Sequence, residues 1–204
     1  MWHTTYNRQF LVDPGQNDAT TYGVHIRRAP NAAMRCIGVH HLTGPENRGG
    51  HHIYLDILDD EGERLKGAIV LYTWQGRQGD PLQVICDKPD NEPAANIPLY
   101  PGQVVTLWVD TGQVIGASDQ VTGIHTAHPD EDTGNTRYHH SFYVVFQLCT
   151  AQTPSSPSAP EQVTPRPDIP EEPVSLASIL PDLLERLNRI HQDSLYIMET
   201  LQKL

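Results

Sequence analysis

Short hydrophobic runs alternate with polar positions from about Tyr22 to Leu148, and clusters of Gly, Pro, Asn and Asp separate them. Residues 52–57 and 35–39 alternate with a period of two, as strands with one buried face do. Many short strands between turn signals are typical of an all-β sandwich. We therefore predict an antiparallel β-sandwich, immunoglobulin-like or jelly-roll-like, over residues 22–149, with strands at 22–28, 34–42, 51–58, 66–74, 82–86, 103–109, 119–125 and 139–148.

The segments on either side of the predicted sandwich differ from it. Residues 1–21 precede the first predicted strand, and we expect them to form a loosely ordered N-terminal arm. Residues 150–174 hold seven of the 17 prolines, among Ser, Thr, Gln and Glu. Because such a composition cannot build a packed core, we predict a Pro-rich linker there. These prolines are Pro154, Pro157, Pro160, Pro165, Pro167, Pro170 and Pro173.

Residues 175–204 show the alternating four- and three-residue spacing of a coiled-coil seam. Leucine at the a positions and isoleucine at the d positions disfavour a parallel dimer, so we predict self-association into a trimer or a higher oligomer. The alternative is a helix that packs on its own sandwich or on a different protein. The predicted oligomerisation residues are Leu176, Leu180, Leu183, Leu187, Ile190, Ile197 and Leu201.

Charge and hydropathy exclude several classes of partner. The chain has 14 Lys and Arg residues against 25 Asp and Glu, a net charge of −11. Because no basic stripe is present, we expect no nucleic-acid partner. No run of about 18 apolar residues occurs, so we expect no membrane insertion. The N-terminal residues also lack the basic start and apolar stretch of a secretory signal.

Histidine is unusually frequent, with 11 residues, six of which form three adjacent pairs. Strand alternation puts His41, His51 and His140 on the inner face at strand ends, where they can converge with His128. Neutral imidazoles at such a rim are candidate ligands for zinc. Alternatively, these rings hydrogen-bond to Asn47, Asn96, Asn135 and backbone groups and hold the loops in place.

Motifs for catalysis are missing from the sequence. It contains no Gly-x-Ser-x-Gly elbow, no phosphate-binding Gly-rich loop, no dinucleotide fingerprint and no His-Glu-x-x-His zinc motif. We therefore predict that the protein is not an enzyme and that it needs no cofactor, zinc being the one candidate ion. A metal-dependent enzyme is kept as an alternative without motif support.

A series of ordered motifs over about 120 residues resembles a His-rich accessory domain that stands beside bacterial cell-wall hydrolases of the muramidase type. The motifs are IGVHHLT (37–43), EN (46–47), HH (51–52), DILD (56–59), DKP (87–89), NEP (91–93), HTAHPDE (125–131), GN (134–135) and HHSF (139–142). The resemblance implies a non-catalytic, extracellular or surface-directed module that binds a glycan or the cell envelope. No hydrolase domain accompanies it in this chain, where a Pro-rich linker and a predicted coiled coil follow instead.

Exposed aromatic residues are the natural platforms for sugar rings. By strand alternation Trp108 faces away from Leu107 and Val109, and Tyr143 faces away from Phe142, so both are predicted glycan-binding residues. The leading hypothesis is a non-enzymatic, multivalent surface or cell-wall glycan-binding module, extracellular or virion-associated and held together by the coiled coil. The alternative is a structural adaptor of a virion or a phage-tail-like particle that docks through its C-terminal helix.

Overall fold

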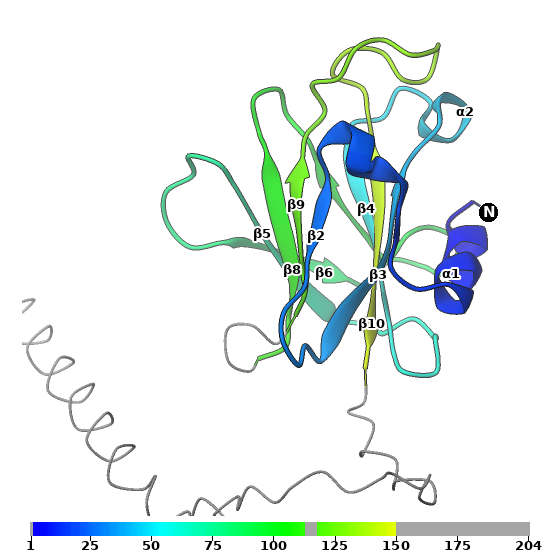
Figure 1. Ribbon diagram of the computed structural model, residues 1–204, viewed down its shortest axis with the longest axis vertical. Coiled ribbons are helices and arrows are strands. Elements are labelled where there is room, and N and C mark those ends of the chain that lie inside the picture. The colour runs from blue at the N-terminus through cyan, green and yellow to red at the C-terminus, as the bar shows by residue number, and fades with distance from the viewer. Residues whose placement is uncertain (1, 113–117, 150–204) are drawn as a thin grey trace, which may run out of the picture. The chain divides into compact units, whose positions relative to one another are not determined.

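A computed structural model describes residues 2–112 and 118–149, which all belong to one compact unit. The predicted linker at 150–174 and the predicted coiled-coil helix at 175–204 lie outside the described residues. So do all seven predicted oligomerisation residues. The account that follows therefore concerns the β-rich part of the chain and the N-terminal segment in front of it (Figure 1).

Two five-stranded sheets make up this part of the chain. The first, named here the β10 sheet, has the order β1-β3-β10-β4-β7, and the second, the β8 sheet, has the order β2-β9-β8-β5-β6. In the β10 sheet the strands are β1 (Gln16–Asn17), β3 (Met34–His41), β10 (Phe142–Leu148), β4 (His52–Leu58) and β7 (Ala95–Pro98). In the β8 sheet they are β2 (His25–Arg27), β9 (Gln120–Ile124), β8 (Val105–Asp110), β5 (Ala68–Trp74) and β6 (Leu82–Cys86).

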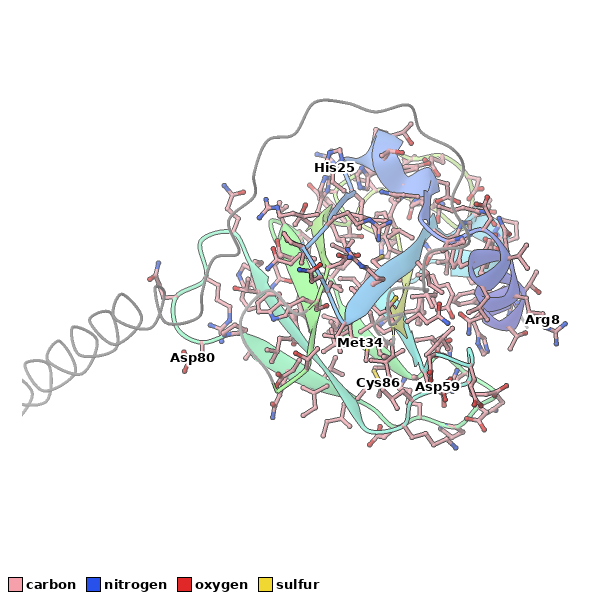
Figure 2. All side chains as sticks on the ribbon, turned by 60° about the horizontal axis from the view of Figure 1, so that its bottom comes forward. Arg8, His25, Met34, Asp59, Asp80 and Cys86 are labelled. Atoms are coloured by element: carbon pink, nitrogen blue, oxygen red, sulfur yellow. The ribbon has the colours of Figure 1, made fainter. Side chains whose placement is uncertain are left out.

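One hydrophobic core joins the two sheets. Alternate residues of each strand point inward, as Val105, Leu107 and Val109 do on β8 and Phe142 and Val144 do on β10. All of these side chains are buried and belong to the same cluster, and side chains fill the space between the sheets (Figure 2). The prediction of a mostly β chain with paired layers is thus confirmed, and each of the eight predicted strands overlaps an observed one.

Strand β10 departs from the predicted all-antiparallel arrangement. It lies between β3 and β4, antiparallel to β3 and parallel to β4, and β1 is also parallel to β3. Strands β3 and β4, which follow one another in the chain and would form a hairpin in the predicted arrangement, are therefore separated by β10. Because β10 is covered on both faces, its residues from Phe142 to Phe146 are all buried, which explains the nearly continuous apolar run there.

The N-terminal segment is not the loosely ordered arm that we predicted. Residues 2–22 form the helix α1 (Trp2–Val12), the short strand β1 and the 3-10 helix η1 (Asp18–Tyr22). Helix α1 packs on the outer face of β3 and β10, where Phe10 is 2% exposed (Figure 1). Arg8 lies on the opposite face of the helix and points away from the sheets (Figure 2).

The physical reason for this order is a second, smaller hydrophobic cluster. Trp2, Tyr6 and Phe10 are spaced by four residues and so share one face of α1. They pack with Tyr143 and Val145, which β10 presents on its outer side. None of the helices in the two described ranges, α1, η1 and α2 (Gly44–Asn47), is long and apolar enough to cross a membrane.

Candidate functional site

Two histidines meet at the end of the β10 sheet. His41 ends β3, and His140 lies just before β10, whose Phe142 pairs with His41. The Nε2 atom of His41 is 3.0 Å from Nδ1 of His140, and Nε2 of His140 is 3.0 Å from the carbonyl oxygen of Pro129. The carbonyl can only accept, so this network assigns the His140 proton to Nε2 and leaves Nδ1 as the acceptor for His41.

A carboxylate completes this group of ligand atoms. Ligand atoms of His41, Glu131 and His140 all lie within 4.8 Å of one another. The hydroxyl of Tyr22 donates to Oε1 of Glu131 at 2.5 Å, and Nδ2 of Asn135 donates to Oε2 at 3.1 Å. Partial burial raises the pKa of the Glu131 carboxyl, but these hydrogen bonds outweigh it and the net pKa is lowered. We name His41, Glu131 and His140 the rim cluster.

His128 lies against the rim cluster. Its ring is stacked on His125, with 4.1 Å between ring centroids, and is 5.2 Å from the His140 ring. Its Nε2 atom is buried and has no hydrogen-bond partner. Burial is the main cause that lowers the pKa of both His128 and His41 to about 4, so both rings are neutral at pH 7.

His51, the fourth predicted metal ligand, does not join this group. It lies just before β4, which begins at His52 and is separated from β3 by β10. Its ring stacks on His52, with centroids 5.0 Å apart, and lies 6.0 Å from the His139 ring. Of the four predicted ligands, only His41 and His140 belong to the rim cluster, and Glu131, which the spacing did not single out, completes it. His128 lies beside the cluster, and His51 lies outside it.

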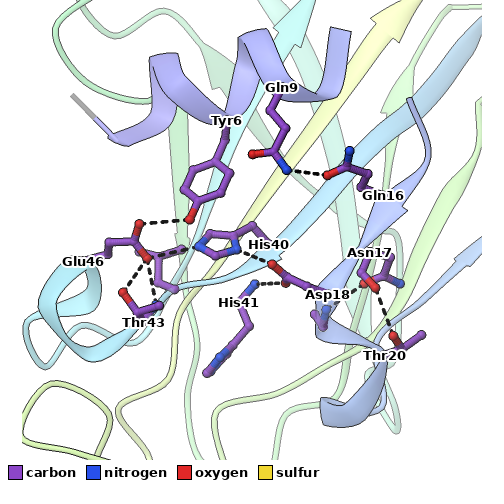
Figure 3. A network of polar contacts seen from close by, with 12 residues as sticks. Tyr6, Gln9, Gln16, Asn17, Asp18, Thr20, His40, His41, Thr43 and Glu46 are labelled. Atoms are coloured by element: carbon purple, nitrogen blue, oxygen red, sulfur yellow. Dashed lines mark hydrogen bonds and ion pairs between the residues drawn. The ribbon is translucent and has the colours of Figure 1, made fainter. Parts of the chain in front are cut away.

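His40 has the opposite environment to His41, although the two are adjacent. Its Nδ1 is 2.5 Å from Oδ2 of Asp18, and its Nε2 is 3.1 Å from Oε2 of Glu46 (Figure 3). Burial lowers the pKa of His40, but the two carboxylates outweigh it and the net pKa is raised. Tyr6 of α1 stacks on this ring, with centroids 3.9 Å apart, and donates to Glu46. This network fastens α1 and η1 to β3.

Asparagines hold the loops around the rim, but they bond to backbone carbonyls and to other side chains, and not to the histidine rings that the alternative interpretation paired with Asn47, Asn96 and Asn135. Nδ2 of Asn47 lies 2.9 Å from the Gly134 carbonyl, 2.6 Å from the His139 carbonyl and 2.8 Å from Oδ1 of Asn135. Asn135 in turn donates to the carbonyl of Leu42 at 2.8 Å. Both asparagines are buried, so the loop before β10 is tied to the end of β3 by side-chain hydrogen bonds.

The prediction that Tyr143 is an exposed glycan platform is wrong. Tyr143 does face away from the main core, but α1 covers it and it is 0% exposed. The Trp2 ring meets it edge-on, with centroids 5.0 Å apart. Its hydroxyl donates to Oδ1 of Asn7 at 2.6 Å and to the buried carboxylate of Asp56. A sugar ring has no access to this side chain.

Trp108, the other predicted platform, lies half-buried on the outer face of the β8 sheet. Strand pairing places it opposite Leu71 on β5 and Gln120 on β9. The same row continues to Gln83 on β6 and Arg27 on β2, so it crosses all five strands. At a strand spacing of about 4.8 Å, the row is roughly 19 Å long. We name it the Trp108 row.

Comparisons with known proteins assign no family to the chain. No family model matches it, and no curated protein matches it. Among solved structures, the chain is similar to the C-terminal fragment of the pilus adhesin SpaC from Lactobacillus rhamnosus GG, with 11% sequence identity and a TM-score of 0.27. The similarity covers 50% of this chain and 47% of that chain, so this chain spans about half the length of the fragment. A likeness this weak carries no argument about function.

Proposed function

We propose that this protein is a non-enzymatic surface module that binds glycans, and that the Trp108 row is its binding face. The observation that carries the proposal is the pairing register around Trp108, which puts a half-buried indole between Leu71 and Gln120. Gln83 follows Leu71 at one end of the row, and Arg27 follows Gln120 at the other. An indole face stacks on the apolar face of a sugar ring. Glutamine amides both donate and accept, as sugar hydroxyls require.

The shape of this face favours a chain of sugars over a single sugar. A row that crosses five strands is roughly 19 Å long, which exceeds the size of one sugar ring. Next to it on the same face, Thr73 and Thr106 pair across β5 and β8 and add two hydroxyl groups. Cell-wall polysaccharide is therefore the ligand class that we propose, in an extracellular or virion-associated setting.

Multivalency would make such a shallow site effective. A flat face with one aromatic platform binds weakly by itself, and linked weak sites gain avidity by factors of about 10²–10⁴ when they engage together. The predicted C-terminal coiled coil would supply that linkage through a trimer or a higher oligomer. This part of the proposal rests on the sequence pattern from Leu176 to Leu204, which lies outside the described residues.

The test is a pulldown of the full-length protein with purified cell-wall sacculi. We expect the wild type to bind and Trp108→Ala to lose binding by at least tenfold, because the stacking platform is gone. Tyr100→Ala is the matched control, since Tyr100 is 55% exposed and lies outside the Trp108 row. Equal binding by Trp108→Ala and the wild type would refute the proposed face.

A wild type that binds no cell-wall glycan would refute the proposed function itself. In that case, copurification of a partner protein in fixed stoichiometry would favour the adaptor hypothesis. Substitution of Leu183 and Ile190 by Asp would then abolish that copurification if the helix is the docking element. The same double substitution tests self-association, since we expect native mass spectrometry to show a monomer in place of the oligomer.

A further inference from the structure

We propose that the rim cluster is a binding site for a divalent transition-metal ion, with Zn²⁺ as the preferred ion. His41 supplies Nε2, His140 supplies Nδ1 and Glu131 supplies a carboxylate oxygen. The site lies at the end of β3 and β10, and it involves no residue of the Trp108 row. It is therefore independent of the proposed glycan-binding function.

The distances require only small adjustments to hold an ion. Ligand nitrogens about 2.0–2.1 Å from a tetrahedral zinc ion are about 3.3 Å apart. The two imidazole nitrogens are 3.0 Å apart, so they need to separate by about 0.3 Å. The three ligand atoms lie within 4.8 Å of one another, so the carboxylate has to approach by at most about 1.5 Å. Glu131 is exposed, and its side chain can move by that amount.

Partners around the rim cluster already orient the ligand atoms. A metal-bound histidine commonly donates its other ring N–H to a carbonyl or a carboxylate. His140 does this through Nε2 to the Pro129 carbonyl, which leaves Nδ1 free of a proton. Tyr22 and Asn135 each donate to one oxygen of Glu131, and each oxygen keeps a lone pair for the ion. These contacts fix the direction of two of the three ligands.

The hydrogen bond between the two histidines marks the position of the ion. In the metal-free protein His41 donates its Nε2 proton to Nδ1 of His140. Zinc would take the place of this shared proton, and the proton would move to Nδ1 of His41. Binding therefore requires a change of tautomer in His41, whose proton stays on the same ring.

The unpartnered ring nitrogen of His128 is a second, independent observation that supports an ion at the rim cluster. His128 is 9% exposed, and its buried Nε2 has no hydrogen-bond partner. A buried polar atom without a partner is unfavourable and calls for an explanation such as an ion. Its ring lies 5.2 Å from the His140 ring. His128 contributes none of the ligand atoms that lie within 4.8 Å of one another, so an ion in the rim cluster would supply the missing partner through a metal-bound water.

The donor set selects the class of ion. Calcium and magnesium prefer six or more oxygen ligands, whereas this site offers imidazole nitrogens and one carboxylate. Imidazole suits zinc, copper, iron and nickel, and zinc accepts a mixed set of nitrogen and oxygen ligands in four-coordinate geometry. We therefore expect Zn²⁺ to bind and Mg²⁺ and Ca²⁺ not to compete.

The experiment is a zinc titration of the full-length protein by isothermal calorimetry after treatment with a chelator, with ZnCl₂ alone as the probe. We expect one Zn²⁺ per chain in the wild type. Glu131→Gln should weaken binding at least tenfold, and this exposed substitution keeps an oxygen to accept from Tyr22 or Asn135. His51→Ala and His139→Ala are the matched controls, because both residues lie outside the rim cluster. They should bind as the wild type does.

A spectroscopic readout separates this site from surface histidines. Nitrogen-15 NMR of the histidine rings should show the His41 proton move from Nε2 to Nδ1 when zinc is added. An unchanged His41 tautomer, no zinc bound, or binding lost in His51→Ala or His139→Ala but kept in Glu131→Gln would each overturn the proposal. Zinc bound by Trp108→Ala as tightly as by the wild type would show that the two sites are independent.

Discussion

The outer faces of the two sheets look alike in the sequence and differ in the folded protein. On both, an aromatic residue points away from the main core, Tyr143 on β10 and Trp108 on β8. Helix α1 covers the first and leaves it 0% exposed, whereas Trp108 stays half-buried. Strand alternation therefore tells which side of a sheet a residue occupies but does not tell whether that side reaches solvent.

The cover provided by α1 also determines which polar groups each outer face contains. Under α1, Asp56 is fully buried and pairs with Arg64 at 2.8 Å, accepts from the Ala94 backbone N–H at 2.8 Å and accepts from Tyr143. A buried carboxylate needs such partners, because it costs several kcal/mol without them. The Trp108 row instead combines an aromatic ring with two glutamines and an arginine on an outer sheet face, which suits a ligand that binds reversibly.

The largest effect on the difference between the two outer faces is expected from removing Phe10, the buried side chain that holds α1 on the β10 sheet. Phe10→Ala deletes a ring that is 2% exposed and packs on Tyr143 and Val145. We expect it to lower the free energy of unfolding by about 3–5 kcal/mol, as for other buried Phe→Ala changes. Urea denaturation measures this loss. A loss below 1 kcal/mol would contradict the packing of α1 on the β10 sheet.

A second prediction concerns the space beneath Phe10. A Cβ atom at Gly38 would lie 2.1 Å from the Phe10 ring, so Gly38→Ala must displace that ring. We expect a cost of about 1–3 kcal/mol from overpacking. The same substitution in the Phe10→Ala background should cost almost nothing, since the obstructing ring is gone. Additive costs in this double-mutant cycle would contradict the contact.

The pKa values of the adjacent residues His40 and His41 are shifted in opposite directions, and these shifts predict how the free energy of unfolding depends on pH. Burial lowers the pKa of His41 and His128 to about 4, so below about pH 6.5 the unfolded chain binds more protons than the folded one. The free energy of unfolding should fall as the pH drops from about 6.5 to 4. His40 has a raised pKa, so its stabilisation is present below about pH 6.5 and is lost as the pH rises through the raised value.

The measurement is the melting temperature against pH, with a chelator present so that no ion competes for the rings. His128→Gln should flatten the acid slope, and His25→Gln is the control because His25 is exposed. If both variants keep the slope of the wild type, the burial of His128 does not govern it.

The smallest effect on stability is expected at the other face. Trp108→Ala removes a half-buried ring from the outer side of β8, so we expect a cost of about 1 kcal/mol or less. This makes the variant a clean probe of glycan binding, since the fold survives. A loss as large as that of Phe10→Ala would mean that Trp108 is covered as completely as Tyr143.

The strands were largely predictable because they alternate or run continuously apolar. Short elements were not predictable: β7 (Ala95–Pro98) begins two residues after Pro93, where the sequence indicates a turn. Helix α1 was missed although Trp2, Tyr6 and Phe10 repeat every four residues, a signal that one helical face is apolar. That spacing predicts an apolar helix face that has to be covered, here by an outer sheet face.

The rim cluster was predictable only in part. Alternation placed His41 and His140 on the inner side because both belong to or adjoin regular strands. It did not bring His51 into the cluster, because β4, which follows His51, is separated from β3 by β10. It has no bearing on Glu131, which lies in a long loop. Glu131 is positioned by hydrogen bonds from Tyr22 and Asn135, residues far apart in the chain, and no local pattern encodes such contacts.

The central place of β10 has a consequence for how the chain folds during synthesis. Strands β3 and β4 cannot complete their sheet until the residues after Phe142 have been made, because β10 lies between them. Helix α1, although made first, docks on Tyr143 and Val145 and must wait as well. Contacts this distant in sequence slow folding. We therefore expect the nascent chain to stay unfolded on the ribosome until β10 emerges, and then to fold in one cooperative step.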